Sequence, residues 1–150
     1  MRRHDALIPL THDHHHALAQ VRRLRVAAKA PGDERRAGAK HFLEFFSSDT
    51  IAHFREEEEV VLPLVVDAPE IKETLQRVMM QHLEIHARVR KLQSEYEAGA
   101  PAAETLLAIA AALERHVRFE EKVVFPLIEM ILGRSGLADI TLPPRHRAAI

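Results

Sequence analysis

The chain carries one short segment twice, and this repeat limits the folds that it can adopt. HFREEEEVVLP runs from His53 to Pro63, and HVRFEEKVVFP runs from His116 to Pro126. The two copies share His, Arg, two Glu, two Val and Pro at equivalent positions. A second pair, DHHHALAQVRRL (13–24) and QHLEIHARVRKL (81–92), also aligns. The sequence therefore predicts a duplicated helical hairpin.

Proline and glycine divide the chain into four long stretches. Interruptions fall at Pro31-Gly32, at Ala68-Pro69 and between Gly99 and Pro101, and such residues commonly mark the ends of helices. The stretches are rich in Ala, Leu, Glu, Arg and Lys, which favour helix, and their apolar residues recur at helical spacing. They cover residues of about 11–30, 34–66, 70–97 and 102–132.

Four amphipathic helices with short links predict an all-α fold, an antiparallel up-down-up-down four-helix bundle. A length of 150 residues favours a single domain over 1–150. We expect the bundle to occupy about 10–132 and an irregular tail to follow at 133–150. The apolar part of this tail, around 140–150, is expected to pack on the bundle or on another subunit, as in a homodimer.

Composition excludes several classes of function. The chain has no cysteine, so disulfides, thiolate metal sites and cysteine nucleophiles are ruled out. The net charge is −1 and no long basic stripe occurs, so nucleic acid is not an expected partner. No apolar run reaches the roughly 18 residues that span a membrane, and the N-terminus has no apolar signal segment. We therefore expect a cytoplasmic protein without a membrane partner.

Histidine is the unusual residue type, with eleven copies in the chain. Residues four apart lie on one face of a helix. Three pairs have this spacing: His53 with Glu57, His82 with His86, and His116 with Glu120. His82 and His86 flank Ile85 on an apolar stripe, so both are expected to point into the bundle.

The predicted inward set combines five imidazoles and two carboxylates from four helices: His14, His53, Glu57, His82, His86, His116 and Glu120. Buried polar and charged groups are costly unless they are paired or bind a metal. Imidazole together with carboxylate suits iron, zinc, manganese or copper. Seven ligands are too many for one ion and fit two ions bridged by both carboxylates. An odd number of imidazoles leaves one ion with an open position for a small molecule.

The ligand on the first helix has two candidates. His14 lies on the face of Leu18 and Val21, whereas the adjacent His15 lies about 100° round the helix. The internal repeat favours His14, and His15 is the alternative. Other acidic residues of the repeated segments are expected on solvated faces or as partners that orient a ligand imidazole: Glu56, Glu58, Glu59 and Glu121.

The order His, His-x-x-x-Glu, His-x-x-x-His, His-x-x-x-Glu resembles the hemerythrin family, including its bacterial HHE cation-binding members, over about residues 10–132. The resemblance implies a non-haem di-iron centre with an oxo or hydroxo bridge, and O₂ bound at a five-coordinate iron. Zinc or manganese is the alternative metal. Glu120 departs from the oxygen carriers, where the last carboxylate is an Asp five residues after the His. It matches the Glu at four in many HHE domains.

The resemblance implies a binding protein for O₂ or a related small ligand, serving storage, delivery or sensing. The sequence offers no general base, dedicated substrate pocket or cofactor loop, so catalysis is the weaker interpretation. An enzyme acting on peroxide or nitric oxide is one alternative, and an iron or cation store or sensor is another. A ferritin-like oxidase is excluded, because its site needs Glu from two helices and Glu-x-x-His from the other two.

Overall fold

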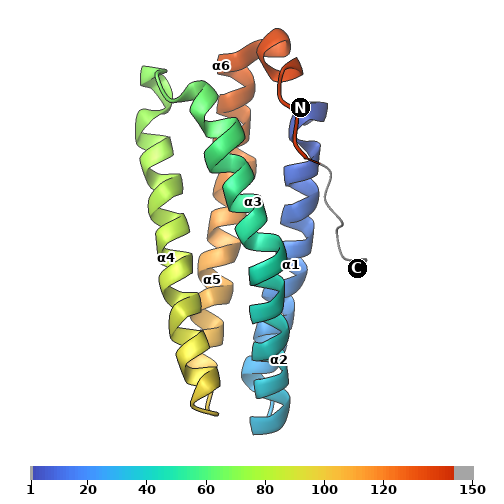
Figure 1. Ribbon diagram of the computed structural model, residues 1–150, viewed down its shortest axis with the longest axis vertical. Helices are drawn as coiled ribbons and strands as arrows, with labels where there is room; N and C mark the ends of the chain where they lie inside the picture. The colour runs from blue at the N-terminus through green and yellow to red at the C-terminus, as the bar shows by residue number, and fades with distance from the viewer. Residues whose placement is uncertain (1, 144–150) are drawn as a thin grey trace.

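The computed structural model describes residues 2–143, and these residues form four long helical rods (Figure 1). In chain order the elements are η1 (Asp5–Leu7), α1 (Ile8–Lys29), α2 (Gly32–Phe45), η2 (Phe46–Thr50), α3 (Ile51–Glu56), η3 (Glu57–Val61), η4 (Leu62–Val65), η5 (Pro69–Ile71), α4 (Lys72–Glu97), α5 (Ala103–Phe119), η6 (Glu120–Val124) and α6 (Phe125–Ala138), where η marks a short 3-10 or π segment. The described residues contain no strand, so the predicted all-α class is confirmed.

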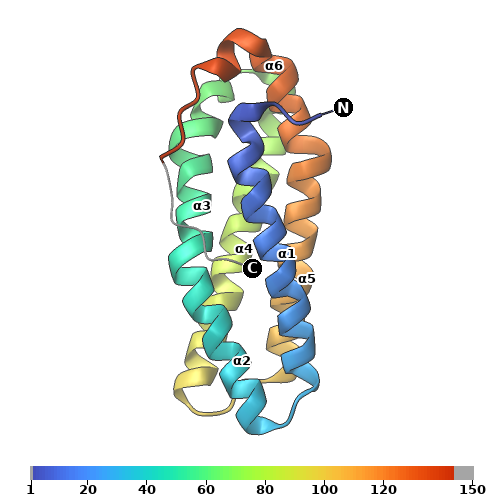
Figure 2. The same cartoon turned by 90° about the vertical axis from the view of Figure 1, so that its right-hand side faces the viewer.

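The rods are continuous stacks of these elements, and consecutive rods run in opposite directions along the bundle (Figure 1). Rod one contains η1 and α1, rod two runs from α2 to η4, rod three contains η5 and α4, and rod four runs from α5 to α6. The turned view shows α1 flanked by α3 and α5 (Figure 2). The helix of the fourth rod is interrupted by a kink at Gly133, whose φ is 64°, next to the predicted end near residue 132, and a further helical segment runs on to Ala138.

Both copies of the repeated segment interrupt the α-helix with a π turn. In η3 and η6 the residue before the proline donates its N–H to the carbonyl of Glu57 or Glu120, five positions back. Pro63 and Pro126 lack an N–H, and a proline ring crowds the carbonyl four residues earlier. A widened turn relieves this crowding. Each carboxylate therefore stands at the first residue of a π turn, a feature that often accompanies functional sites.

Two apolar clusters fill the bundle, and a polar layer separates them. On α1 the order is Leu10, then His14, then Ala17, and the two apolar residues belong to different clusters. On α4, Val78 and Ile85 flank the polar layer in the same way. Each fully buried Leu, Ile or Phe stabilises the fold by about 1.5–3 kcal/mol. The clusters above and below fix the depth at which the polar side chains meet.

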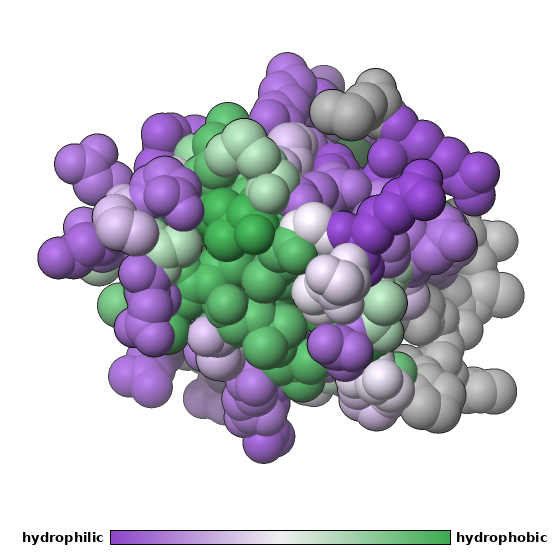
Figure 3. Space-filling model, turned by 90° about the horizontal axis from the view of Figure 1, so that it is seen from above, coloured by the Kyte–Doolittle hydropathy of each residue, from purple (hydrophilic) through white to green (hydrophobic). Residues whose placement is uncertain are grey.

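The upper end of the bundle exposes apolar side chains (Figure 3). Leu64, at the end of the second rod, and Val66, just after it, are 50% and 60% exposed. Ile140 is buried, and Leu142 packs against the apolar cluster that contains Leu10 and Val78. The described part of the predicted tail therefore lies on the bundle. Residues 144–150 lie outside the described residues. Between residues 2 and 143, no helix is both long and apolar enough to cross a membrane.

Candidate metal centre

Six of the seven predicted ligand residues meet in the polar layer. Every rod contributes, and no member of the set exceeds 5% exposure. The members are His14 from α1, His53 from α3, Glu57 from η3, His82 from α4, His116 from α5 and Glu120 from η6. Side chains that are distant in the sequence thus converge inside the bundle.

These six residues form two overlapping groups that share both carboxylates. One group is His14, His53, Glu57 and Glu120, and the other is Glu57, His82, His116 and Glu120. Within each group the candidate ligand atoms all lie within 4.8 Å of one another. We call the His14–His53 side the first half-site and the His82–His116 side the second half-site.

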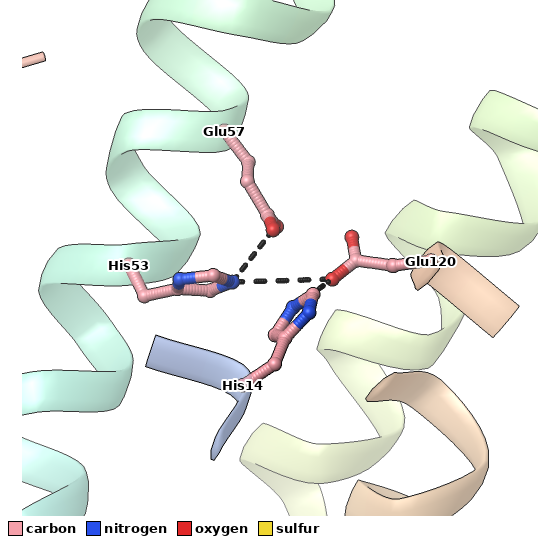
Figure 4. Close-up of side chains that lie close together, drawn as sticks. All are labelled: His14, His53, Glu57 and Glu120. Atoms are coloured by element: carbon pink, nitrogen blue, oxygen red, sulfur yellow. Dashed lines mark hydrogen bonds and ion pairs between the residues drawn. The ribbon is translucent and has the colours of Figure 1, made fainter. Parts of the chain in front are cut away.

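The first half-site is shown in Figure 4. Nε2 of His14 lies 3.0 Å from Oε1 of Glu120. Nε2 of His53 lies 2.6 Å from Oε1 of Glu57 and 3.9 Å from Oε1 of Glu120. Two imidazoles from different rods therefore face the same pair of carboxylates.

The second half-site repeats this arrangement. Nε2 of His82 lies 3.2 Å from Oε2 of Glu57, and Nε2 of His116 lies 3.1 Å from Oε1 of Glu120. Glu57 thus turns one oxygen to each half-site. This is the arrangement expected of a carboxylate that bridges two cations.

Each imidazole also has a partner at its other nitrogen, which we call its outer partner. The Nδ1 distances are 3.1 Å for His14 to Glu121, 2.9 Å for His53 to Asp13, 2.8 Å for His82 to Glu58 and 2.8 Å for His116 to Gln81. An acceptor at Nδ1 holds the proton there and leaves Nε2 as the ligand atom. All four rings are therefore oriented with Nε2 toward the carboxylates.

Several of the facing atoms are close to one another but are not aligned as hydrogen bonds. Nε2 of His53, His82 and His116 and both carboxylate oxygens of Glu57 are buried without a hydrogen-bond partner. Buried polar atoms in this state are costly. Atoms that point toward a common centre rather than along hydrogen bonds suit metal coordination. The residues therefore fit a pair of metal ions.

The comparison with protein families agrees with this geometry. Residues 7–128 match the hemerythrin HHE cation binding domain, which is most of the chain. The chain belongs to this family. Comparisons with curated proteins and with solved structures found no significant match. The matched region includes all six residues that meet in the polar layer of this HHE domain.

The histidines and glutamates of the HHE domain stabilise one another's charged forms. Burial lowers the pKa of His53, but Glu57 and Asp13 outweigh it and hold that pKa well above its usual value. In His14 and His82 burial likewise acts against acidic neighbours, and both pKa values are raised. Burial raises the pKa of Glu120, yet His116 and other imidazoles hold it well below the usual range. A cation that binds here must therefore displace protons.

The seventh predicted ligand, His86, lies outside both groups. Its side chain is exposed rather than inward, and its ring contacts Phe46 edge-on at 5.4 Å. Phe54 stacks on His82 at 3.9 Å and contacts the ring of His86 edge-on at 5.7 Å. On α1, His14 is the residue in the polar layer and the alternative His15 is exposed.

A small cavity adjoins the first half-site of the HHE domain. It has a volume of about 20 Å³, and His14, His53, Ala17, Leu113 and Val117 are among its lining residues. A cavity needs roughly 10–15 Å³ to hold one water-sized molecule. In the repeat, Val117 occupies the position that Phe54 holds near the second half-site. Phe54 and His116 also line the cavity, so it touches imidazoles of both half-sites.

Two outer partners were not predicted from the sequence. Asp13 and Gln81 directly precede His14 and His82, at equivalent positions of the repeat. Each contacts the imidazole of a neighbouring rod rather than of its own. The π turns were also missed, although a proline six residues after each shared glutamate, Glu57 and Glu120, was a usable signal.

Proposed function

We propose that this HHE domain holds two iron ions and binds O₂ or a related small ligand at them, for storage, delivery or sensing. The proposed ligands are the six residues of the polar layer: His14, His53, Glu57, His82, His116 and Glu120. We leave out His86 because its side chain is exposed. Bound iron would supply an open coordination position and the electrons that small oxidising ligands require.

The observation that carries the proposal is the sharing of both carboxylates by two groups of donors. Each half-site combines two imidazoles with Glu57 and Glu120. Two dications sharing these anions and surrounded by the outer carboxylates would offset the cost of burying charge. A single ion would leave two imidazoles of the opposite half-site without a comparable role.

The donor set and the family resemblance together favour iron. All donor atoms are imidazole nitrogens and carboxylate oxygens, which suit iron, zinc or manganese more than a soft metal ion. The sequence has no cysteine, so no thiolate competes for the centre. Zinc and manganese are the alternatives that elemental analysis decides.

The cavity beside the first half-site supports the small-ligand part of the proposal. Its volume of about 20 Å³ suits a diatomic molecule rather than an organic substrate. The same cavity favours one alternative, turnover of peroxide or nitric oxide. Thr50 and His16 line it beside the apolar residues, and polar groups next to a bound small molecule assist proton transfer.

The test is to purify the protein without added metal and to measure its elements and its visible spectrum under argon and air. We expect two irons per chain and a charge-transfer band that appears with O₂ and disappears when O₂ is removed. One zinc per chain as the sole metal would overturn the iron proposal. Irreversible bleaching with peroxide consumption would favour the enzyme.

Two substitutions and a neighbouring control connect the spectrum to the centre. His53→Ala and His116→Ala remove one ligand from each half-site, and each should abolish the band. His15→Ala alters an exposed imidazole next to a proposed ligand and should leave the band intact. Loss of the band in the control would show that the spectrum arises elsewhere.

A further inference from the structure

The outer partners follow the same internal repeat as the ligands. Asp13 and Gln81 stand one residue before the ligand histidine of rods one and three, and Glu58 and Glu121 stand one residue after the bridging glutamates. Each half-site therefore has one outer partner of each type. The first half-site has Asp13 and Glu121, and the second has Gln81 and Glu58.

The two half-sites differ in the charge of one outer partner but hardly in its geometry. Asp13 accepts from Nδ1 of His53 at 2.9 Å, and Gln81 accepts through its Oε1 from Nδ1 of His116 at 2.8 Å. An amide nitrogen at that place could not accept this proton, so the oxygen must face the ring. Both acceptors fix the ring, but only Asp13 adds a negative charge.

We propose that the first half-site binds metal more tightly than the second, because a carboxylate orients His53 where an amide orients His116. This inference rests on the proposed two-metal function. A carboxylate acceptor raises the basicity of a ligand imidazole, and loss of such a partner typically lowers metal affinity about 10–100-fold. Asp13 and Gln81 thereby determine the order in which the two positions fill.

Exposure strengthens the difference. The side chain of Asp13 is 13% exposed, so water screens its charge weakly. In the second half-site the remaining carboxylate, Glu58, is 34% exposed, compared with 24% for Glu121 in the first. Water therefore screens the two outer carboxylates of the first half-site, Asp13 and Glu121, less than it screens Glu58, the one outer carboxylate of the second.

One cation acts in the opposite direction and must be weighed. Nη2 of Arg3 lies 2.9 Å from Oε2 of Glu121, the outer partner of His14. Arg3 also pairs with Glu129, so its positive charge is itself balanced by a second carboxylate. It contacts Glu121 rather than Asp13, and it leaves the charge difference between Asp13 and Gln81 in place.

The test is a stepwise titration of the metal-free protein with Co²⁺, followed by calorimetry and by the visible spectrum. The wild-type protein should bind two ions in two steps whose dissociation constants differ by about tenfold or more. Asp13→Asn should weaken the first step by about 10–100-fold, and Gln81→Glu should tighten the second by a similar factor. Both changes bring the two dissociation constants closer together. Asp13→Asn does so by weakening the tighter step, and Gln81→Glu by tightening the weaker step.

Glu59→Gln is the matched control. It makes the same change from carboxylate to amide at a side chain that is 62% exposed, and it should leave both steps within about twofold, because exposed charges are screened. Two equal steps in the wild-type protein, unaffected by Asp13→Asn and Gln81→Glu, would overturn the inference and leave the two-metal function standing. Binding of fewer than two ions by the wild-type protein would overturn both.

If Asp13→Asn does not fold, Gln81→Glu still decides the question. It adds charge beside His116 without removing an acceptor, and a second step that is unchanged or weaker would contradict the proposal.

Discussion

Rods one and two form the first helical hairpin, and rods three and four form the second. The two hairpins contribute similar donors to the polar layer, but different side chains surround those donors. Phe54 of the first hairpin stacks on His82 at 3.9 Å and meets His116 edge-on at 5.6 Å, so it covers the second half-site. The equivalent residue of the second hairpin is the smaller Val117, and both residues line the cavity that touches His14, His53 and His116. The donors keep the symmetry of the repeat, whereas the packing around them breaks it.

The polar donors and their apolar neighbours therefore follow the repeat to different degrees. Residues in equivalent positions form two similar groups of candidate donors that share Glu57 and Glu120. The apolar neighbours are not among these donors. They are therefore free to differ in size between the two hairpins, as Phe54 and Val117 do.

The largest expected effect comes from removing a shared donor. Glu57→Gln and Glu120→Gln each take one negative charge from both half-sites at once. Because the carboxylates belong equally to the two groups, either change should reduce the metal content from two ions per chain to fewer than one. Elemental analysis after gel filtration measures this.

The single-sided variants sharpen the result. His53→Ala and His116→Ala each affect one half-site and should retain about one ion. Retention of two ions by Glu57→Gln would contradict the shared role of that carboxylate. Circular dichroism of the same samples checks that the bundle has folded.

The next effect concerns the ligand rather than the metal. Val117→Phe makes the surroundings of the first half-site resemble those of the second. A phenyl ring should fill the cavity, lower the affinity for O₂ by at least about tenfold and lower the free energy of unfolding by about 1–3 kcal/mol through overpacking. The metal content should stay at two ions per chain.

Phe54→Val is the reciprocal change, and it should open space at the second half-site. Oxygen titration of both variants gives their O₂ affinities, and elemental analysis of the same samples gives their metal content. Unchanged O₂ affinity in Val117→Phe would mean that the ligand approaches from another side.

The residues that the structure brings together are those for which the repeat and the helical period agree. His14, His53, Glu57, His82, His116 and Glu120 satisfy both criteria, and the structure brings them together. His86 satisfies only the helical period, since its counterpart in the repeat is Leu18. A spacing of four places two residues on the same face but leaves about 40° between them, and here His82 is buried whereas His86 is exposed.

The outer partners were harder to predict for a physical reason. Asp13 and Gln81 lie one residue from a ligand and therefore about 100° away from it round the helix. From their own helix they belong to a solvated face. The face becomes an interior contact only because the neighbouring rod packs against it. The helical period of a single segment does not predict how two rods are oriented relative to each other.

A smaller effect should appear in the pH dependence of the metal-free protein. The pKa values of His14, His53 and His82 are raised above the usual 6.5. Their contribution to stability is present below pH 6.5 and is lost as the pH rises through the raised values. The pKa values of Glu120 and Glu121 are lowered from the usual 4.5, the latter to about 2, so their contribution is lost as the pH falls toward those values.

The metal-free protein should therefore be most stable between about pH 4.5 and pH 6.5. Urea unfolding at several pH values measures this. Asp13→Asn removes a carboxylate that raises the pKa of His53, so it should reduce the loss of stability above pH 6.5. Metal-loaded protein should show the opposite trend, because protons compete with metal for the imidazoles. A metal-free protein that gains stability steadily up to about pH 9 would contradict these signs.

The smallest effect tests how closely the rods of the first hairpin approach. A Cβ atom added at Gly38 of α2 would lie 2.5 Å from the Cβ atom of Ala27 on α1. In the second hairpin, α4 and α5 contain no glycine, so no such contact depends on a missing side chain. Gly38→Ala should cost about 1–3 kcal/mol through overpacking, offset by about 1 kcal/mol of improved helix propensity. The net loss should be about 0–2 kcal/mol.

Gly32→Ala is the control for this change, because an added Cβ there meets nothing within 4 Å. Thermal unfolding of the two variants should differ by a few degrees, with Gly38→Ala the less stable. Equal stability would mean that α1 and α2 separate at little cost. The polar layer would then depend on the apolar clusters on either side of it, rather than on close contact between the rods of this hairpin.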